Sequence, residues 1–156
     1  MEDELLAIEA WAGPMLSALG NSERRALLLD IGRELRRSQQ RRIADQANPD
    51  GTPYAPRKKR VDRSKGLREK AGRIKREAMF RKLRAAKFLK VEATAEGLSV
   101  GYSGRAAYVA RVHQEGLSER VARGGPQYTY PKRSLLGFTD PDRAMIVDKL
   151  LAHFAR

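Results

Sequence analysis

The residues with the clearest chemical purpose in this chain are the lysines and arginines at positions 57–90. This stretch holds 16 basic and 3 acidic residues, a net charge of +13. The whole chain has 32 basic and 19 acidic residues, which also gives +13, so the rest of the sequence is neutral. Lysine and arginine neutralise phosphates and release counterions, so the stretch predicts contact with a nucleic-acid backbone. The alternatives are a solvated charged loop or a loop paired with acids on another subunit.

The most basic part of this stretch has few apolar residues to bury. We expect residues 57–84 to form a basic insertion that is mobile in isolation or becomes ordered on assembly. Reading a base sequence needs a rigid helix or stacking aromatic rings, and the stretch offers only Phe80 and Phe88. Any DNA contact is therefore expected to involve the backbone alone. The candidate contacts to DNA, a channel lumen or a neighbouring subunit are Arg57, Lys58, Lys59, Arg60, Arg63, Lys65 and Arg68.

Few residues in the chain are suited to catalysis or metal binding. Nucleophilic catalysis needs a base beside a serine, threonine or cysteine, and the chain has no cysteine and two histidines, His113 and His153. His113 lies in a predicted helix without a nucleophile motif near it, so a structural role is favoured over a hydrolytic or metal-binding one. No phosphate-binding loop or dinucleotide fingerprint is present. We therefore expect no enzyme activity, no cofactor and no metal.

The sequence also gives no sign of a membrane protein. No stretch reaches the roughly 18 apolar residues of a membrane span. The N-terminus starts with the acids Glu2, Asp3 and Glu4, whereas a secretory signal peptide starts with basic residues. The absence of cysteine fits synthesis in a reducing cytoplasm.

Two predicted helices come first among the elements that position these residues. Apolar residues have helical spacing over 5–12, and a Gly-Pro pair at 13–14 predicts a break before a further short turn. A second helix is predicted from a cap at Asn21 or Ser22 to about Ala47. One of its faces is apolar and predicted to be buried, whereas the opposite face is predicted to be solvated. The apolar stripe is Leu28, Ile31, Leu35 and Ile43, and the polar face is Arg33, Arg36, Arg37, Gln40 and Arg41.

Turns, strands and further helices are predicted after this point. A turn is expected at 48–53, and a thin apolar stripe predicts helix at 69–84. The clearest pattern is a β-hairpin with strands at 88–94 and 98–102. The remaining predictions are a helix at 105–115 closed by Gly116, a loop at 117–126, a strand at 127–130 and a helix from residue 140. The chain is thus predicted to be one α+β domain, 1–156, with N-terminal helices, a basic extended segment, a small antiparallel sheet with a packed helix, and a C-terminal helix.

Four short motifs stand in a fixed order along the chain, at 49–56, 79–84, 110–116 and 131–139. Their sequences are P-D-G-T-P-Y-A-P, M-F-R-K-L-R, A-R-V-H-Q-E-G and P-K-R-S-L-L-G-F-T. Together with the final helix, this ordered set resembles the phage virion morphogenesis family, the tail completion proteins of contractile-tailed phages and prophages. The resemblance covers nearly the whole chain. Its departures are Tyr54, Glu115 and Lys132, where the family favours tryptophan, an aromatic residue and a small residue, and these changes could alter subunit contacts.

The resemblance implies a structural virion protein and not an enzyme. Such a protein would complete or terminate the tail and help to join it to the head. It would act as a ring-forming subunit, with a hexamer as the expected ring, among neck and tail proteins such as the tail tube and the connector. It would be made and assembled in the host cytoplasm and reside in the virion, with the basic segment facing DNA, a neighbouring subunit or solvent. The competing hypothesis is a monomeric protein that binds DNA without sequence preference through residues 57–90.

Within the motifs, five residues stand out by type. His113, Gln114 and Gly116 would fix the end of a helix. Arg133 and Gly137 would shape the corner between a strand and the final helix, where glycine allows a backbone conformation that other residues resist. These residues serve either subunit assembly or only the stability of the monomer, and the sequence leaves both open.

Overall fold

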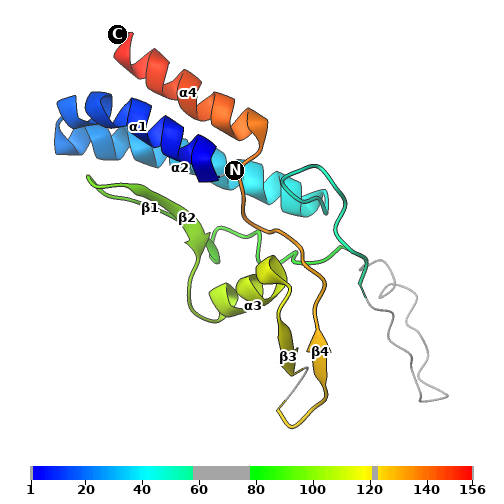
Figure 1. Ribbon diagram of the computed structural model, residues 1–156. Coiled ribbons are helices and arrows are strands. Elements are labelled where there is room, and N and C mark those ends of the chain that lie inside the picture. Colours follow the sequence, from blue (N-terminus) through cyan, green and yellow to red (C-terminus); the bar gives the residue numbers. More distant parts are fainter. Residues whose placement is uncertain (1, 58–77, 121–122, 156) are drawn as a thin grey trace.

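The computed structural model describes residues 2–57, 78–120 and 123–155, with the backbone alone for residues 2–5. This part of the chain is α+β, as predicted. Its helices are α1 (Glu2–Ala18), α2 (Asn21–Ala44), α3 (Gly104–Glu115) and α4 (Asp140–Phe154). Its strands are β1 (Leu89–Ala93), β2 (Leu98–Tyr102), β3 (Ser118–Arg120) and β4 (Gln127–Thr129), in the antiparallel pairs β1–β2 and β3–β4. Figure 1 shows α1, α2 and α4 at one end of the molecule, and the β1–β2 hairpin and α3 below them.

The main hydrophobic core lies between α1, α2 and α4. Ile31 and Leu35 of α2 and Leu150 of α4 are almost fully buried there. The predicted apolar stripe of α2 faces this core because its aliphatic residues recur every three or four positions. Complete burial of one such side chain is worth about 1.5–3 kcal/mol. The buried members of the core are Ala12, Leu27, Ile31, Leu35, Ile146 and Leu150.

The predicted C-terminal helix is confirmed. Reciprocal hydrogen bonds between Thr139 and Asp142 cap its start. The Thr139 side chain accepts a hydrogen bond from the backbone N–H of Asp142 at 3.2 Å. The Asp142 carboxylate in turn accepts one from the backbone N–H of Thr139 at 2.9 Å. This capping box and a proline in the first turn satisfy the helix start, so α4 begins immediately after the motif at 131–139.

The predicted β-hairpin is also confirmed, and it packs against α2. Val91 of β1 stands opposite Val100 of β2. The close approach depends on Gly32 in the middle of α2. A Cβ atom at that position would lie 2.4 Å from Val91 Cγ1 and 2.5 Å from Leu98 Cδ1. Glycine therefore lets the helix and the hairpin meet without overlap.

A second core joins the C-terminal half of α2 to α3. Its buried residues are Ile43, Tyr54, Ala110 and Leu135, and Ile43 and Leu135 are fully buried. Helix α3 ends at Gly116, as predicted, with φ = +71°, the left-handed conformation that favours glycine. This core links all four sequence motifs, because Tyr54, Ala110 and Leu135 each belong to a different one, and Met79, Phe80 and Leu83 of the remaining motif pack against it.

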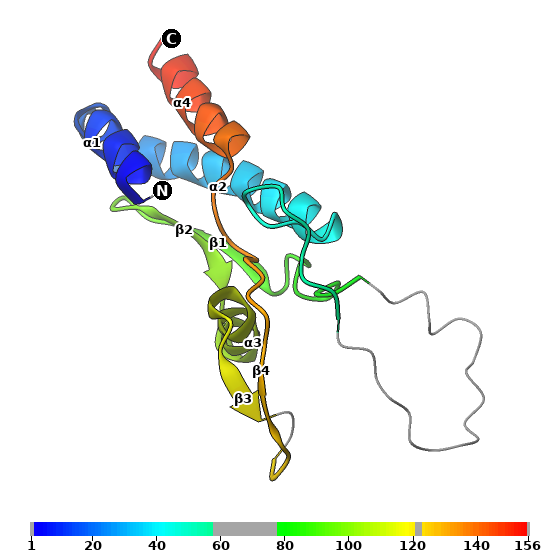
Figure 2. The same cartoon turned by 45° about the vertical axis from the view of Figure 1, so that its right-hand side comes forward.

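The β3–β4 ribbon projects from the body below α3 (Figures 1 and 2). The strand prediction at 127–130 is confirmed by β4, but the prediction of a loop throughout 117–126 is wrong. Residues 118–120 form β3, in which Glu119 pairs with Tyr128. A three-residue strand is too short to produce a recognisable alternation, so its pairing comes from the partner strand.

The first two helices differ from their predictions at three points. Helix α1 continues through Pro14 instead of breaking there. Ile8 and Leu16, on either side of Pro14, both pack on the main core, and this packing offsets the backbone hydrogen bond that proline cannot donate. Helix α2 is capped by Gly20, without a side-chain cap from Asn21 or Ser22, and ends at Ala44.

The helix predicted at 69–84 is wrong over the described residues 78–84, which form irregular structure and turns, and the rest of the prediction lies outside the described residues. Phe80 has φ = +60°, a left-handed conformation that a right-handed helix cannot contain. The predicted contacts from Lys58 to Arg68 also lie outside the described residues. None of the helices in the described chain is long and apolar enough to cross a membrane.

Candidate functional site

The backbone at 133–137 forms the predicted corner before α4, and two buried polar residues of α2 hold it. The Arg42 guanidinium donates hydrogen bonds to the carbonyl oxygens of Ser134 at 2.8 Å and Leu135 at 3.1 Å. It also donates to the side-chain oxygen of Gln39, whose amide donates to the Gly137 carbonyl at 2.7 Å. Gln39 and Arg42 are 4% and 8% exposed. Because buried polar groups need partners, this network ties the corner to α2.

Helix α3 holds the same corner from the other side. The Gln114 amide donates to the Leu136 carbonyl at 2.9 Å, and the Leu136 N–H donates back to the Gln114 side-chain oxygen at 3.0 Å. The Gln114 side chain thus makes the same pair of hydrogen bonds to the Leu136 backbone that a neighbouring β-strand would make. Gly116 follows at the end of α3, where a Cβ atom would lie 3.3 Å from the Tyr130 carbonyl oxygen and from the Lys132 backbone nitrogen.

Arg133 connects the corner to the start of the basic segment. Its side chain is 3% exposed and donates to the carbonyl oxygens of Ala55 at 2.8 Å and Pro56 at 3.0 Å. Its backbone N–H donates to the His113 carbonyl at 2.7 Å. The structure therefore brings Arg133 and His113 together, and Arg133 holds Pro56, the residue before the exposed Arg57.

His113 is half-buried within a row of aromatic rings. Its ring meets Phe80 edge to face at 4.7 Å between centroids and Tyr130 at 5.0 Å. The Nδ1 atom accepts a hydrogen bond from Arg133 at 3.3 Å, so the proton of the neutral ring lies on Nε2. Burial, followed by the nearby Arg133 charge, lowers the pKa of His113 to about 4. The ring is therefore neutral at pH 7, because burial and a nearby positive charge both disfavour its protonated form.

The depressed pKa of His113 predicts that stability falls in mild acid. Between pH 6.5 and about 4 the unfolded chain binds a proton that the folded chain does not, so the free energy of unfolding decreases as the pH falls. The slope from this residue is at most about 1.4 kcal/mol per pH unit. In urea unfolding at pH 7 and pH 5, His113→Gln is expected to lose less stability than the wild type. An equal loss of stability in the two proteins would contradict the assignment.

Gln46 holds the described chain that resumes at residue 78, within the basic segment. Its side chain pairs with the backbone of Met79, accepting from the N–H at 2.6 Å and donating to the carbonyl at 3.0 Å. Its own carbonyl accepts from the Tyr54 N–H at 2.6 Å. Gln46 itself has φ = +57°, a conformation that is uncommon outside glycine. The described chain on both sides of residues 58–77 is therefore anchored to one place, the end of α2.

Sequence reasoning missed Gln39, Arg42 and Gln46. The first two continue the apolar stripe of α2, because Leu35, Gln39 and Arg42 follow one another at intervals of four and three. Their spacing places them on the buried face although both side chains are polar, and the sequence analysis assigned them to neither face. Arg33, Arg37 and Arg41 are exposed as predicted, and Arg36 and Gln40 are partly buried.

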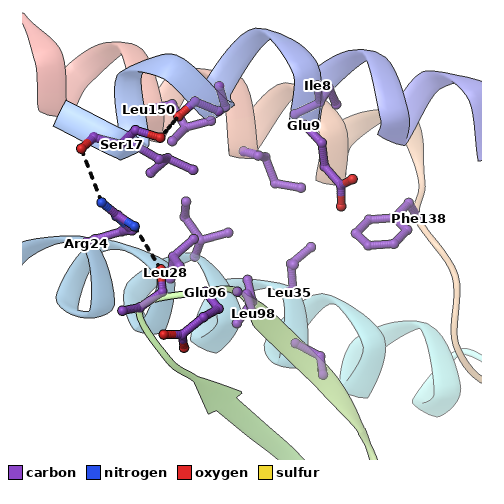
Figure 3. Close-up of a pocket in the computed structure, with 18 of the residues that line it drawn as sticks. Ile8, Glu9, Ser17, Arg24, Leu28, Leu35, Glu96, Leu98, Phe138 and Leu150 are labelled. Carbon is purple, nitrogen blue, oxygen red and sulfur yellow. Dashed lines mark hydrogen bonds between the residues drawn. The ribbon is translucent and has the colours of Figure 1, made fainter. Parts of the chain in front are cut away.

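A separate apolar groove lies beneath α1 (Figure 3). Its volume is about 530 Å³, and Ile8, Leu28, Leu98 and Phe138 are among its lining residues. The Arg24 guanidinium closes one end by donating to the carbonyl oxygens of Leu19 and Ala95, at 3.1 Å each, and of Ser17 at 3.3 Å. Arg24 and Ser17, two polar lining residues at this end, thus bond to backbone carbonyl groups.

Metal chemistry has no candidate centre in the described part of the chain. There, no group of three or more histidine, cysteine, aspartate or glutamate side chains is placed to hold a metal ion. The arrangement is a structural connection. Side chains of α2 and α3 bond to the backbone of the corner at 133–137, and Gln46, just after α2, bonds to the backbone at Met79.

This chain belongs to the phage virion morphogenesis family, whose model matches residues 3–155. It is similar to the tail completion protein S of Escherichia phage P2, with 44% identity over 143 residues, which cover 91% of this chain and 91% of that protein. No solved structure gives a significant match. The resemblance drawn from the four motifs is therefore confirmed, and three of those motifs meet in the network around residues 133–137.

Proposed function

We propose that this chain is a structural virion protein that completes the phage tail and is not an enzyme. The observation that carries the proposal is its 44% identity to a tail completion protein along 91% of both chains. The buried network agrees with it, because Arg42, Gln114 and Arg133 are bonded to backbone carbonyl groups and are not aimed at a shared cavity.

We further propose that the protein acts as a ring, with six copies, at the end of the tail that meets the head. Its partners would be further copies of itself, the tail tube and the connector, and it would reside in the virion after assembly in the host cytoplasm. The charge distribution supports a ring around DNA, because the net +13 of residues 57–90 would repeat around one channel and create a strong positive field.

The anchors described above support a fixed placement of this charge. Arg133 holds the chain just before Arg57, and Gln46 holds it at Met79, so each subunit presents the basic segment from the same place on its body. Repulsion between the copies opposes assembly unless DNA or acidic neighbours offset it. We therefore propose that the segment contacts a DNA backbone or a neighbouring subunit in the assembled particle.

Mass measurement across a concentration series tests the ring against the monomeric DNA-binding alternative. Six copies of 17.5 kDa give about 105 kDa, and light scattering after gel filtration should find this mass together with rings in negative stain. The alternative predicts 17.5 kDa and DNA binding that weakens steeply with salt. A monomer that shifts DNA at low salt would replace the ring proposal, and a ring that shifts no DNA would remove the alternative.

A further inference from the structure

The C-terminal half of α2 carries a row of arginines outside the main core. Arg33, Arg37 and Arg41 recur every four residues, so they are neighbours on one side of the helix. All three are exposed. The row belongs to the body of the protein and precedes the basic segment at 57–90 in the chain.

A second basic stretch lies against this row. The Gln40 side chain of α2 donates a hydrogen bond to the Arg84 carbonyl oxygen at 2.7 Å, and both views show the chain after residue 77 beside the C-terminal half of α2 (Figures 1 and 2). Residues 78–90 contain five basic residues and no acid. The Arg84 side chain is exposed and has no hydrogen-bond or ion-pair partner among the described residues. We call the combined surface the basic face, formed by Arg33, Arg37, Arg41 and Arg84.

The acids of α2 do not neutralise the basic face. Two of the three pair with residues of α4, and the third, Glu34, pairs with Arg37 at 2.6 Å. In the part of the chain that the structure describes, the side chains of Arg33 and Arg41 have no hydrogen-bond or ion-pair partner. Asp45 is exposed just past the end of the helix. The basic face therefore keeps a net positive charge that an external anion can bind.

The basic face lacks the residues on which protein interfaces depend. The centre of such an interface is apolar and depleted of charged residues. None of the exposed large hydrophobic residues of the described chain lies in α2 or at 78–90. They are Leu6, Trp11, Tyr108, Val109 and Leu151. An arginine surface without an apolar centre suits a phosphate backbone, because the planar guanidinium group binds phosphate through paired hydrogen bonds.

The length of the row also suits a DNA duplex. A helix rises 1.5 Å per residue, so the row from Arg33 to Arg41 spans about 12 Å. Double-stranded DNA carries one negative charge per about 1.7 Å of its axis, so a row of this length faces about seven phosphates. The basic face has no aromatic ring on which bases could stack. Binding is therefore expected to depend on charge and not on base sequence.

We propose that the basic face binds the phosphate backbone of double-stranded DNA. The proposal rests on the proposed function in one respect, because the DNA at the end of the tail that meets the head would be the ligand. It adds a fixed surface of the body to the basic segment. The end of α2, which holds Met79 through Gln46, joins the two, so DNA on the segment would also lie near α2.

Fluorescence anisotropy of a short labelled DNA duplex, measured over a series of salt concentrations, tests the basic face. The triple variant Arg33→Gln, Arg41→Gln and Arg84→Gln removes three of its charges. The slope of log binding constant against log salt should fall in magnitude by about 2.7, because each phosphate contact contributes about 0.9. Lysine at the same three positions keeps the charges and should retain the wild-type slope. All three sites are exposed, so urea unfolding should stay close to the wild type.

The matched control removes the same charge elsewhere. Arg105→Gln, Arg123→Gln and Lys132→Gln change exposed residues outside α2 and outside 78–90, and this variant should keep the wild-type slope. Equal losses in the two glutamine variants would show attraction to net charge alone and would overturn the proposal. A wild-type slope in the basic-face variant would also overturn it. A chain that binds no DNA even at low salt would overturn it and leave tail completion, which is measured on assembled particles, standing.

Discussion

Replacing Arg42 by alanine is expected to lower the free energy of unfolding by about 3 kcal/mol. The guanidinium is 8% exposed and donates to the carbonyl oxygens of Ser134 and Leu135 and to the side chain of Gln39. Alanine leaves these acceptors buried without a donor, which costs about 1–3 kcal/mol for each lost group before relaxation. Urea unfolding followed by circular dichroism measures the change.

Arg41→Ala is the matched control for this substitution. Arg41 is the preceding residue of the same helix, but its side chain is exposed, so the change should stay within about 0.5 kcal/mol. Arg42→Met separates packing from hydrogen bonding, because methionine fills similar space and donates nothing. It should remain clearly less stable than the wild type. A methionine variant as stable as the wild type would show that the polar network contributes little.

Replacing Gly137 by alanine is expected to cost about 3 kcal/mol of stability, from steric overlap and backbone strain together. A Cβ atom there would lie 2.5 Å from Pro49 Cγ, and the proline ring cannot turn away. The residue also has φ = +155°, outside the range that alanine prefers. The overlap would push the corner away from the turn at Pro49 and strain the hydrogen bond from Gln39 to the Gly137 carbonyl. Thermal unfolding of the purified variant measures the loss.

Two further variants make the Gly137 prediction specific. Gly101→Ala changes a glycine with no atoms within 4 Å of the added Cβ and should be nearly neutral. Pro49→Ala in the Gly137→Ala background removes the overlapping ring and should recover part of the loss, which a double-mutant cycle measures as coupling. Additive effects of the two substitutions would mean that Pro49 is not the group that requires glycine at 137.

Local signals in the sequence were sufficient for the elements that depend on local chemistry. The hairpin was predicted because its two strands alternate around a short turn. Helix α3 was predicted because Gly116 ends it. The start of α4 was predicted because Asp140-Pro141 favours a first helical turn. In each case the residues that determine the structure lie within a few positions of it.

Elements that depend on distant partners were not predictable in this way. Pro14 ends a helix by propensity, but packing of α1 on the main core keeps the helix continuous. Residues 78–84 have a helical pattern, yet the Gln46 side chain fixes Met79, and Phe80 adopts a left-handed conformation. These outcomes are set by contacts across the chain, which outweigh local propensity.

The candidate site was predicted in part. The motifs pointed to His113, Gln114, Gly116, Arg133 and Gly137, but their mutual contacts were invisible in the sequence. The structure places the first four around one stretch of backbone and links Gly137 to Gln39 and Pro49. Arg42 and Gln39 were missed because burial of polar side chains depends on acceptors about 90 residues away. The role of these residues in assembly or in monomer stability stays a proposal. The Gly137→Ala variant tests the role in stability.

Deletion of the gene for this chain from the phage or prophage that encodes it tests the central claim most directly. Electron microscopy of the particles, with a wild-type copy supplied in trans as the control, is the measurement. The account predicts filled heads and tails that remain unjoined, with complete particles restored by the wild-type copy. Complete, infectious particles at the normal yield in the absence of the chain would contradict its role in tail completion.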